Sequence, residues 1–400
     1  MVAPDLPMGD RVRHYRGSRR QDVLAGLVGI SPDYLSQIER GLKVPSLPIL
    51  HALAQELGVP TAALLAEERP MAEPIADTTE SEVARALLGY GPPRSTAPDP
   101  PAVLRERVES AWRSWQSSPT RFTEAATVLP DLIADTEHAV RKARTLPDDA
   151  ARRAVLRAAA DLYCLLRSYL RRTGRVDLAT LAADRAMRAA EDADDPLRIA
   201  AAQWNLGHVL LAAGDAAEAE EMALMAVEQL AAQQMDDADR TAMAGALHLV
   251  AVVAAARRRR WWEARDRLRQ YAAPAARAVA DSSNVAWTVF GPTNVALHAV
   301  SIEMEAGEAG EALRTADAID TSGLPSLERE FTFGLEVAHC HSLRRDDAAA
   351  LLSLLGLEAV APEDLARTPL ARQLILTVIR RARAMHARQA EQLASRIGLV

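Results

Sequence analysis

The chain has 400 residues, of which 49% are hydrophobic and 25% are charged, as is typical of a folded soluble protein. This length predicts two domains or a repeat array, because it exceeds the usual size of one compact domain. The net charge of −7 argues against nucleic-acid binding over the whole surface, yet arginines cluster near the N-terminus: Arg11, Arg13, Arg16, Arg19 and Arg20. A basic end on an acidic body is typical of a protein that contacts DNA through one domain.

The sequence carries no pattern of export or of membrane insertion. It has no run of eighteen uncharged apolar residues, and residues 1–10 lack the basic and apolar regions of a secretion signal. Its two cysteines, Cys164 and Cys340, lie too far apart in sequence for a paired metal site and make no disulfide framework. We therefore expect a cytoplasmic protein, associated with the nucleoid when bound to DNA, with no membrane contact, metal or cofactor.

Three segments follow one another along the chain. Residues 9–66 show short helices separated by tight turns, and residues 102–400 show helix after helix. Residues 67–101 are predicted to form a linker that leaves room for one short helix at residues 81–88. This linker is rich in helix-breaking prolines: Pro70, Pro74, Pro92, Pro93, Pro98, Pro100 and Pro101. No strand alternation is found, so the sequence predicts an all-α protein.

Residues 21–40 carry the pattern of two short helices joined by a tight turn. Gly29 stands where the chain must reverse, since glycine accepts a positive φ. Ser31 then supplies an N-cap, and Pro32 suits the first position of the second helix. Apolar residues are spaced to meet in one core: Leu24, Ala25, Val28, Ile30, Leu35 and Ile38. The second helix keeps a short polar outward face, which is what reading the major groove requires.

This segment resembles the XRE-type, or phage-repressor-like, helix-turn-helix family from Gly9 to Leu65. The matching residues are Gln21, Leu24–Ala25, Gly29–Ser31, Leu35–Gly41, Pro45–Ser46, Ile49, Leu50, Leu53, Ala54 and Leu57. The family implies a five-helix domain that binds double-stranded DNA as a homodimer. One departure is that Arg19 and Arg20 stand where the family has an apolar residue and a small hydroxyl residue. They weaken the cap of the second helix but place two guanidinium groups where phosphate is expected.

The resemblance and the outward positions together predict the DNA-binding residues. The expected phosphate contacts are Arg19, Arg20, Gln21, Ser31, Arg40 and Lys43. The outward face that is expected to meet the bases comprises Pro32, Asp33, Tyr34, Ser36 and Gln37. Gln37 suits adenine, and Asp33 suits the amino group of cytosine. The alternative is that these side chains are simply solvated, and Glu39 is expected to pair locally with an arginine and to contact no DNA.

The long C-terminal segment is self-similar. Gln203–His208, a turn at Gly214–Asp215 and small residues at Ala219, Ala223 and Ala226 resemble a tetratricopeptide repeat. Weaker copies have turns at Gly174, near Arg259, at Gly307 and near Arg344, and small residues at Ala179, Ala264, Ala312 and Ala349. The spacing exceeds the ~34 residues of a regular repeat, so the repeats are degenerate. Hairpins that cannot bury their apolar faces alone stack into a curved α-solenoid.

A second resemblance covers most of the chain. It rests on Phe290–His298 with Gly307, and on Ser114–Phe122 followed by Leu129–Pro130 and Leu132–Ile133. These segments resemble regulators common in actinobacteria, in which an XRE-type head precedes a degenerate tetratricopeptide-like body. The body is then expected to act as a sensor or dimerisation domain.

Two pairs of residues are candidates for contacting an effector, either a peptide or a small molecule. Asn294 and His298 lie four residues apart and share a helix face, and Trp204 and His208 repeat that spacing. In tetratricopeptide arrays the first helix of each hairpin lines the concave surface. The alternative is that Trp204 belongs to the core and that both histidines are satisfied donors between helices.

Two other clusters favour structural roles. The rings of His339 and His341 point to different helix faces, so a metal site is not expected. Arg257–Arg260 with Trp261 and Trp262 would suit a second nucleic-acid patch. We favour a helix end, where arginines bind carbonyls and acidic neighbours while the tryptophans pack.

These features predict a ligand-responsive transcriptional regulator. The alternative is a protein-interaction scaffold, or an antitoxin-like protein, in which DNA binding is secondary. An enzyme is not expected, because the sequence lacks a phosphate-binding glycine loop, a nucleophile elbow and zinc-protease or paired-cysteine motifs.

Overall fold

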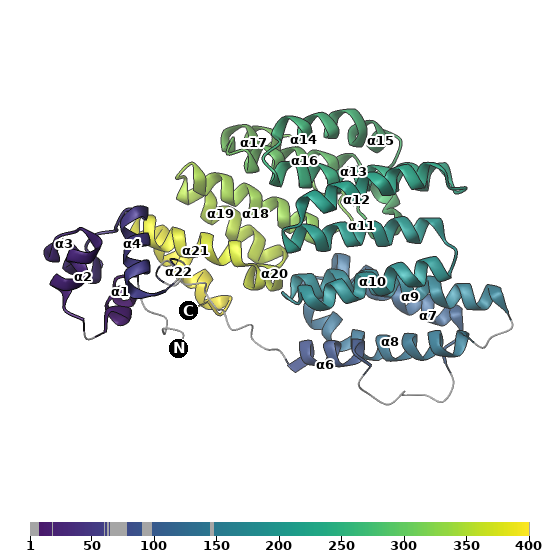
Figure 1. Ribbon diagram of the computed structural model, residues 1–400. Coiled ribbons are helices and arrows are strands. Elements are labelled where there is room, and N and C mark those ends of the chain that lie inside the picture. Colours follow the sequence, from purple (N-terminus) through teal and green to yellow (C-terminus); the bar gives the residue numbers. More distant parts are fainter. Residues whose placement is uncertain are drawn as a thin grey trace. The chain divides into compact units, whose positions relative to one another are not determined.

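Figure 1 shows the computed structural model, which describes residues 8–17, 19–59, 61, 64, 78–89, 98–144 and 148–399. Within these residues all regular structure is helical and no strand occurs. The chain divides into two compact units, Met1–Asp77 and Thr78–Val400. The protein is therefore all-α, as the sequence predicts.

The N-terminal unit packs four described helices around one small core. They are α1 (Met8–Arg16), α2 (Gln21–Val28), α3 (Pro32–Glu39) and α4 (Leu47–Leu57). The core comprises Val12, Leu24, Ala25, Leu35, Ile38, Leu50, Leu53, Ala54 and Leu64. The fifth helix that the family implies would follow α4, where most residues lie outside the described ones.

The turn between α2 and α3 forms as its residues predict. Gly29 ends α2 with φ 74° and ψ 30°, the left-handed region that glycine enters without strain. Ser31 caps α3, because its hydroxyl accepts a hydrogen bond of 3.1 Å from the Tyr34 backbone N–H. Arg20, at the N-cap of α2, makes no such side-chain bond, which confirms that this cap is weak.

The C-terminal unit begins with three helices that precede its helical hairpins and pack against the first of them: α6 (Thr78–Leu87), α7 (Pro101–Ser117) and α8 (Arg121–Ala143). Val83 and Leu87 of α6 are fully buried in the same core as residues of α7, α8 and α9 (Asp149–Arg172). The short helix in the proline-rich stretch thus belongs to the C-terminal unit.

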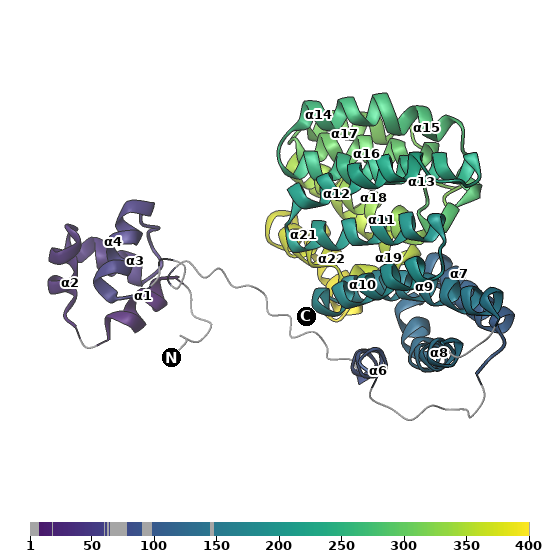
Figure 2. The same cartoon turned by 45° about the vertical axis from the view of Figure 1, so that its right-hand side comes forward.

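Six helical hairpins follow, and Figure 1 and Figure 2 show them stacked in chain order from α9 toward α17. The first helices are α9, α11 (Pro196–Ala213), α13 (Asp237–Arg257), α16 (Pro292–Glu305), α18 (Leu327–Leu343) and α21 (Pro369–Arg381). Their partners are α10 (Val176–Asp192), α12 (Ala216–Ala231), α14 (Trp261–Arg267), α17 (Ala309–Ala316), α19 (Asp347–Val360) and α22 (Ala384–Arg396). A π-helix at Leu268–Ala272 and α15 (Ala273–Arg277) extend α14, and α20 (Pro362–Arg367) precedes α21.

The predicted turns fall between the helices of the first five hairpins. Six small residues predicted at the crossings are fully buried: Ala179, Ala219, Ala223, Ala226, Ala264 and Ala312. In the last of these repeats the residue with a positive φ is Arg345, at 61°, so the turn lies near Arg344 as predicted. The prediction of Ala349 is wrong by one position, because Ala350 is the fully buried alanine. Ala349 lies in the first turn of α19, where its backbone N–H donates to the capping carboxylate of Asp346 at 3.0 Å.

The array curves until its far end meets its beginning. Arg121 at the start of α8 forms a fully buried ion pair with Asp364 of α20. Arg172 at the end of α9 joins the same carboxylate at 2.7 Å. These contacts join residues more than 190 positions apart, so the first helices of the hairpins enclose a concave surface.

Among the described helices, α13 alone is long and apolar enough to cross a membrane. Its apolar window is 61% buried, and α11, α12, α14 and α16 pack around it. This packing is typical of a central core helix.

Candidate functional site

A hollow on the N-terminal unit lies between α1, α2 and α3. It is lined by Arg13, Arg16, Arg20, Gln21, Asp22, Pro32, Ser36, Glu39 and Arg40. Five predicted DNA-binding residues therefore share one surface: Arg20, Gln21, Pro32, Ser36 and Arg40. Arg13 and Arg16 of the basic N-terminal cluster line the hollow as well, although the sequence pattern singled out neither as a contact residue.

Glu39 connects the three helices that form this hollow. Its buried carboxylate accepts hydrogen bonds from the Arg16 guanidinium at 2.6 and 3.0 Å. It also accepts one from the Gln21 side-chain amide at 2.6 Å. The bond to Glu39 raises the pKa of Arg16. The expected pairing of Glu39 with an arginine is confirmed, but the partner is on α1 and not close in sequence, so Glu39 ties three helices together.

The outward face of α3 carries polar groups that contact each other. Pro32 and Asp33 are exposed, whereas Tyr34, Ser36 and Gln37 are half-buried. The Gln37 amide donates to the Asp33 carboxylate at 3.2 Å. The two predicted base readers are thus held side by side, one helical turn apart.

The predicted phosphate contacts have mixed surroundings. Arg20 is exposed and pairs with Asp22 at 2.6 Å, which raises the pKa of Arg20. Arg19 donates to the Glu56 backbone carbonyl at 2.8 Å. The exposed Lys43 ammonium lies 5.5 Å from the centre of the Tyr34 ring. Each of these three cations is exposed at the surface of the N-terminal unit.

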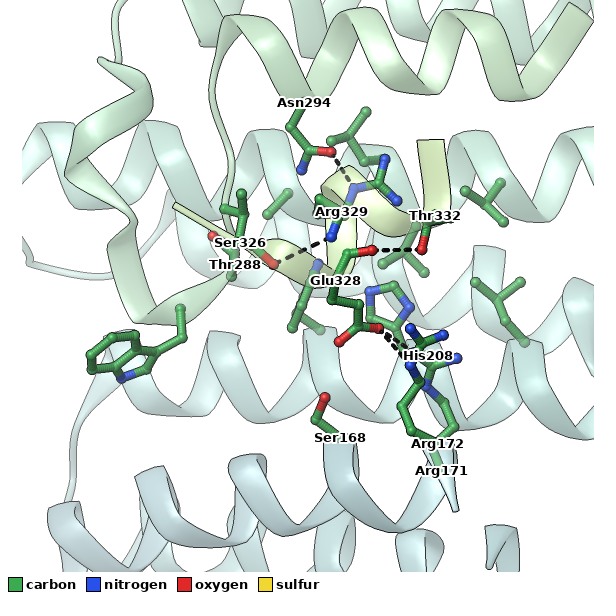
Figure 3. A pocket seen from close by; sticks show the side chains of 18 of the residues that line it. Ser168, Arg171, Arg172, His208, Thr288, Asn294, Ser326, Glu328, Arg329 and Thr332 are labelled. Atoms are coloured by element: carbon green, nitrogen blue, oxygen red, sulfur yellow. Dashed lines mark hydrogen bonds and ion pairs between the residues drawn. The ribbon is translucent and has the colours of Figure 1, made fainter. Parts of the chain in front are cut away.

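The concave side of the C-terminal unit holds a cavity of about 280 Å³, seen from close by in Figure 3. The first helices α9, α11, α13, α16 and α18 line it, together with α7 and residues 287–289. The four predicted effector residues, Trp204, His208, Asn294 and His298, all face this cavity. The structure therefore brings together residues that the sequence placed on two separate helices.

The two histidines of the cavity are neutral. Burial, aided by the charges of Arg167 and Arg171, lowers the pKa of His208 well below its ordinary value. Burial and Arg329 do the same for His298. The His298 Nδ1 atom is buried without a hydrogen-bond partner. The hydrogen bonds of this ring are therefore not all satisfied by contacts between helices.

Six arginines also line the cavity, and the sequence pattern did not single them out as effector residues: Arg121, Arg167, Arg171, Arg172, Arg257 and Arg329. A signal was present in α9, where arginines interrupt a run of buried apolar residues from 165 to 172. Arginine is frequent along the whole chain, so these positions did not stand out.

Glu328 on α18 forms ion pairs with three of these arginines, and Figure 3 shows its carboxylate pointing at Arg171 and Arg172. It lies 2.9 Å from Arg171, 3.5 Å from Arg172 and 3.6 Å from Arg121. Burial alone would raise its pKa, but these three positive charges hold the pKa of Glu328 far below the ordinary value. Glu328 is therefore ionised and fully engaged.

Glu336 lies one turn of α18 beyond Thr332, and its pKa shifts in the opposite direction to that of Glu328. Burial raises the pKa of its carboxyl to about 7, although Arg329 and Ser301 oppose the shift. The Ser301 hydroxyl donates to this carboxylate at 2.7 Å. The cavity thus contains one carboxylate that is always charged and one that titrates near neutral pH.

Comparison with known proteins bears on the first of these two surfaces. Residues 7–67 match a family model described as a helix-turn-helix domain. The N-terminal unit is a helix-turn-helix domain. No curated protein matches the chain significantly.

The full chain shows distant likeness to solved structures. One is the Bacillus thuringiensis PlcR in complex with the peptide PapR7 and DNA, at 10% identity and TM-score 0.30, covering 85% of this chain and 98% of that chain. Another is the apo form of the competence regulator ComR from Streptococcus vestibularis, at 11% identity and TM-score 0.28, covering 98% of each chain.

Outside the helix-turn-helix domain, the arginine run 257–260 has the structural role that the sequence favoured. Arg258 and Arg260 pair with Glu220 at 2.8 and 2.6 Å, and Arg257 donates to the Leu211 carbonyl. The expected packing of both tryptophans is wrong for Trp262, which is 68% exposed. In the described part of the chain, no three metal-binding side chains cluster, around His339 or elsewhere.

Proposed function

We propose that this protein is a sequence-specific DNA-binding transcriptional regulator whose helical array binds an effector. The observation that carries the proposal is the helix-turn-helix domain, with a capped α3 that presents polar side chains beside a basic hollow. Its outward residues suit the major groove, and the surrounding cations suit phosphates.

The roles of individual residues follow from their surroundings. Asp33, Tyr34, Ser36 and Gln37, with Pro32, form the face that meets base edges. Phosphate contacts are assigned to Arg19, Arg20, Gln21, Ser31, Arg40 and Lys43. Gln21 is supported in this role by its bond to Glu39, which fixes its amide near the N-terminus of α2.

The cavity is proposed as the effector site, with Trp204, His208, Asn294 and His298 in contact with a peptide or small molecule. It is concave, enclosed largely by helices and lined by both aromatic rings and charged or polar side chains that can orient a ligand. It also spans α9 and α18, which Glu328 joins. A ligand held between these helices would change the curvature of the array.

The regulator is proposed to act in the cytoplasm as a homodimer, because operator half-sites must match the separation of two recognition helices. A change in the array would then alter that separation and so the affinity for DNA. This part of the proposal rests on the dimeric operator binding that is usual in helix-turn-helix families.

Genome-wide mapping of bound DNA tests the proposal. The native protein is compared with a Ser36→Ala/Gln37→Ala variant and with a Ser282→Ala/Gln233→Ala control, whose changes lie at exposed positions of the array. We expect discrete sites with a repeated half-site for the native protein and the control, and their loss in the first variant.

Absence of discrete sites in the native protein, together with a stable protein partner in purified material, would contradict the proposal. The protein would then be a scaffold, or an antitoxin-like protein, in which DNA binding is secondary.

A further inference from the structure

The cavity holds more positive charge than its own carboxylates balance. Six arginines line it, and the carboxylates that line it are Glu305, Glu328 and Glu336, with Asp364 immediately behind. Glu328 and Asp364 are shared among Arg121, Arg171 and Arg172. The remaining arginines, Arg167, Arg257 and Arg329, form no ion pair with any carboxylate in the described residues.

These three guanidinium groups are held by neutral oxygens instead. Arg167 donates through Nε to the Asn205 side-chain carbonyl at 2.6 Å, and only 3% of the residue is exposed. Arg329 donates through Nε to the Asn294 carbonyl at 2.8 Å. Figure 3 shows this Asn294–Arg329 pair at the cavity wall. Arg257, which is exposed and also lines the cavity, donates to a backbone carbonyl.

A buried charge without a counter-ion destabilises the folded state, so such groups persist where a function needs them. Neutral carbonyl partners fix the orientation of a guanidinium and leave its charge available. The charge of Glu336 acts on Arg329, but Glu336 forms no ion pair with an arginine in the described residues and accepts a hydrogen bond from Ser301.

Aromatic rings line the same cavity as these cations. Trp112 and Trp287 stack with centroids 5.4 Å apart and an interplanar angle of 2°, and both line the cavity. Trp204 lies 5.4 Å from the Arg167 guanidinium. A ring of the ligand would find flat apolar surfaces close to the positive charges.

We propose that the effector is a small organic anion, a carboxylate or phosphate attached to a flat apolar group, whose charge is bound by Arg167 and Arg329 with Arg257 at the mouth. This inference rests on the proposed effector site and names its ligand chemistry. Arginine is suited to both anions because its planar fork makes paired hydrogen bonds. The cavity of about 280 Å³ lies just below the ~300–1,000 Å³ range of small-molecule sites, which favours a compact ligand over an extended peptide.

Thermal unfolding and titration calorimetry of the full-length protein test this inference. The probes are benzoate and phenyl phosphate at millimolar concentration, with benzamide as the neutral analogue of the same shape. We expect at least one anion to raise the Tm while benzamide does not. The stronger of the two anions distinguishes a carboxylate from a phosphate ligand.

Variants then locate the anion. Arg167→Gln and Arg329→Gln are each expected to weaken anion binding at least about tenfold, the effect of losing one charged hydrogen bond. Arg329→Lys keeps the charge and is expected to retain part of the affinity. Arg153→Gln removes an exposed arginine elsewhere on the array and is expected to leave binding unchanged. The Tm of each unliganded variant shows whether it folds.

Equal stabilisation by benzamide, no stabilisation by either anion, or a shift that survives in both glutamine variants would overturn the inference. A short apolar peptide with a free C-terminus, compared with its amidated form, tests a peptide carboxylate as the source of the charge. Binding that depends on the free terminus supports the anionic chemistry, and binding that ignores it contradicts it. None of these readouts involves DNA, so mapped operator sites with no anion binding would refute this inference alone.

Discussion

Arg167 provides a quantitative test of the charge imbalance in the cavity. Burial first, and then the charge of Arg171, lowers the pKa of the Arg167 guanidinium from 12.5 to about 9. A shift of this size corresponds to roughly 5 kcal/mol of destabilisation of the charged form, at 1.36 kcal/mol per unit. At pH 7 the group is still protonated, so the folded protein carries this destabilisation in full. It is relieved only as the pH rises from about 9 toward 12.5.

Methionine is similar in length to arginine and carries no charge. Replacing Arg167 by methionine therefore removes the destabilisation that comes from the buried charge, but it also loses two contacts. Asn205 loses a donor, which costs about 1–3 kcal/mol, and the cation over the Trp204 ring is lost, which costs about 1 kcal/mol. We therefore expect Arg167→Met to stabilise the C-terminal unit by about 1–3 kcal/mol. For a unit of this size, the Tm rises by roughly 2–4 °C.

Arg172→Met is the matched control in the same cavity. Arg172 pairs with Glu328 and Asp364, so its removal leaves buried carboxylates with less compensation and is expected to destabilise by about 3–5 kcal/mol. Calorimetric unfolding between pH 6 and 8, without added ligand, measures both variants. If Arg167→Met unfolds as early as Arg172→Met, the charge of Arg167 is balanced in the folded protein and the reasoning is refuted.

Three further predictions concern other parts of the molecule. Burial raises the pKa of Glu336 from 4.5 to about 7, so the folded state holds a proton that the unfolded state releases near pH 4.5. The free energy of unfolding is therefore expected to fall by about 3 kcal/mol as the pH rises from 4.5 to about 7. Glu336→Gln removes this slope, and a Tm–pH profile that keeps it would contradict the assignment. Gly245→Ala places a methyl group 2.0 Å from the Phe290 ring and is expected to destabilise by about 1–3 kcal/mol in urea unfolding. Gly356→Ala, in open space on α19, is the control and is expected to be neutral or stabilising, and equal losses at the two sites would refute the packing. Glu39→Gln weakens the bonds that position α1 and α2, and operator affinity measured by fluorescence anisotropy is expected to fall about tenfold, whereas unchanged affinity would show that Glu39 does not organise the DNA-binding surface.

Local signals made the helix-turn-helix domain predictable from the sequence. Gly29 needed a positive φ, and Ser31 before Pro32 fixed the start of the next helix. These are short-range requirements, so the sequence alone determines them. The turns of the hairpins were predictable for the same reason, and the one-residue error at Ala349 arose in a repeat whose turn residue, Arg345, is not a glycine.

The cavity was only partly predictable, because it depends on contacts between distant helices. The i, i+4 spacing placed His208 and His298 on the inner faces of their helices, and both line the cavity. Nothing local indicated that Arg121 would meet Asp364, which lies 243 residues away, or that Glu328 would gather three arginines. That arrangement follows from the curvature of the whole array.

Affinity for a mapped operator is the most direct test of the proposed function. The purified protein is titrated against the operator and against the same DNA with its half-sites scrambled, at one fixed salt concentration. We predict binding to the operator at least ~10³-fold tighter than to the scrambled DNA. The Ser36→Ala/Gln37→Ala variant is predicted to lose this preference and to keep its affinity for scrambled DNA. Equal affinity of the native protein for both sequences would contradict the assignment of α3 as a recognition helix.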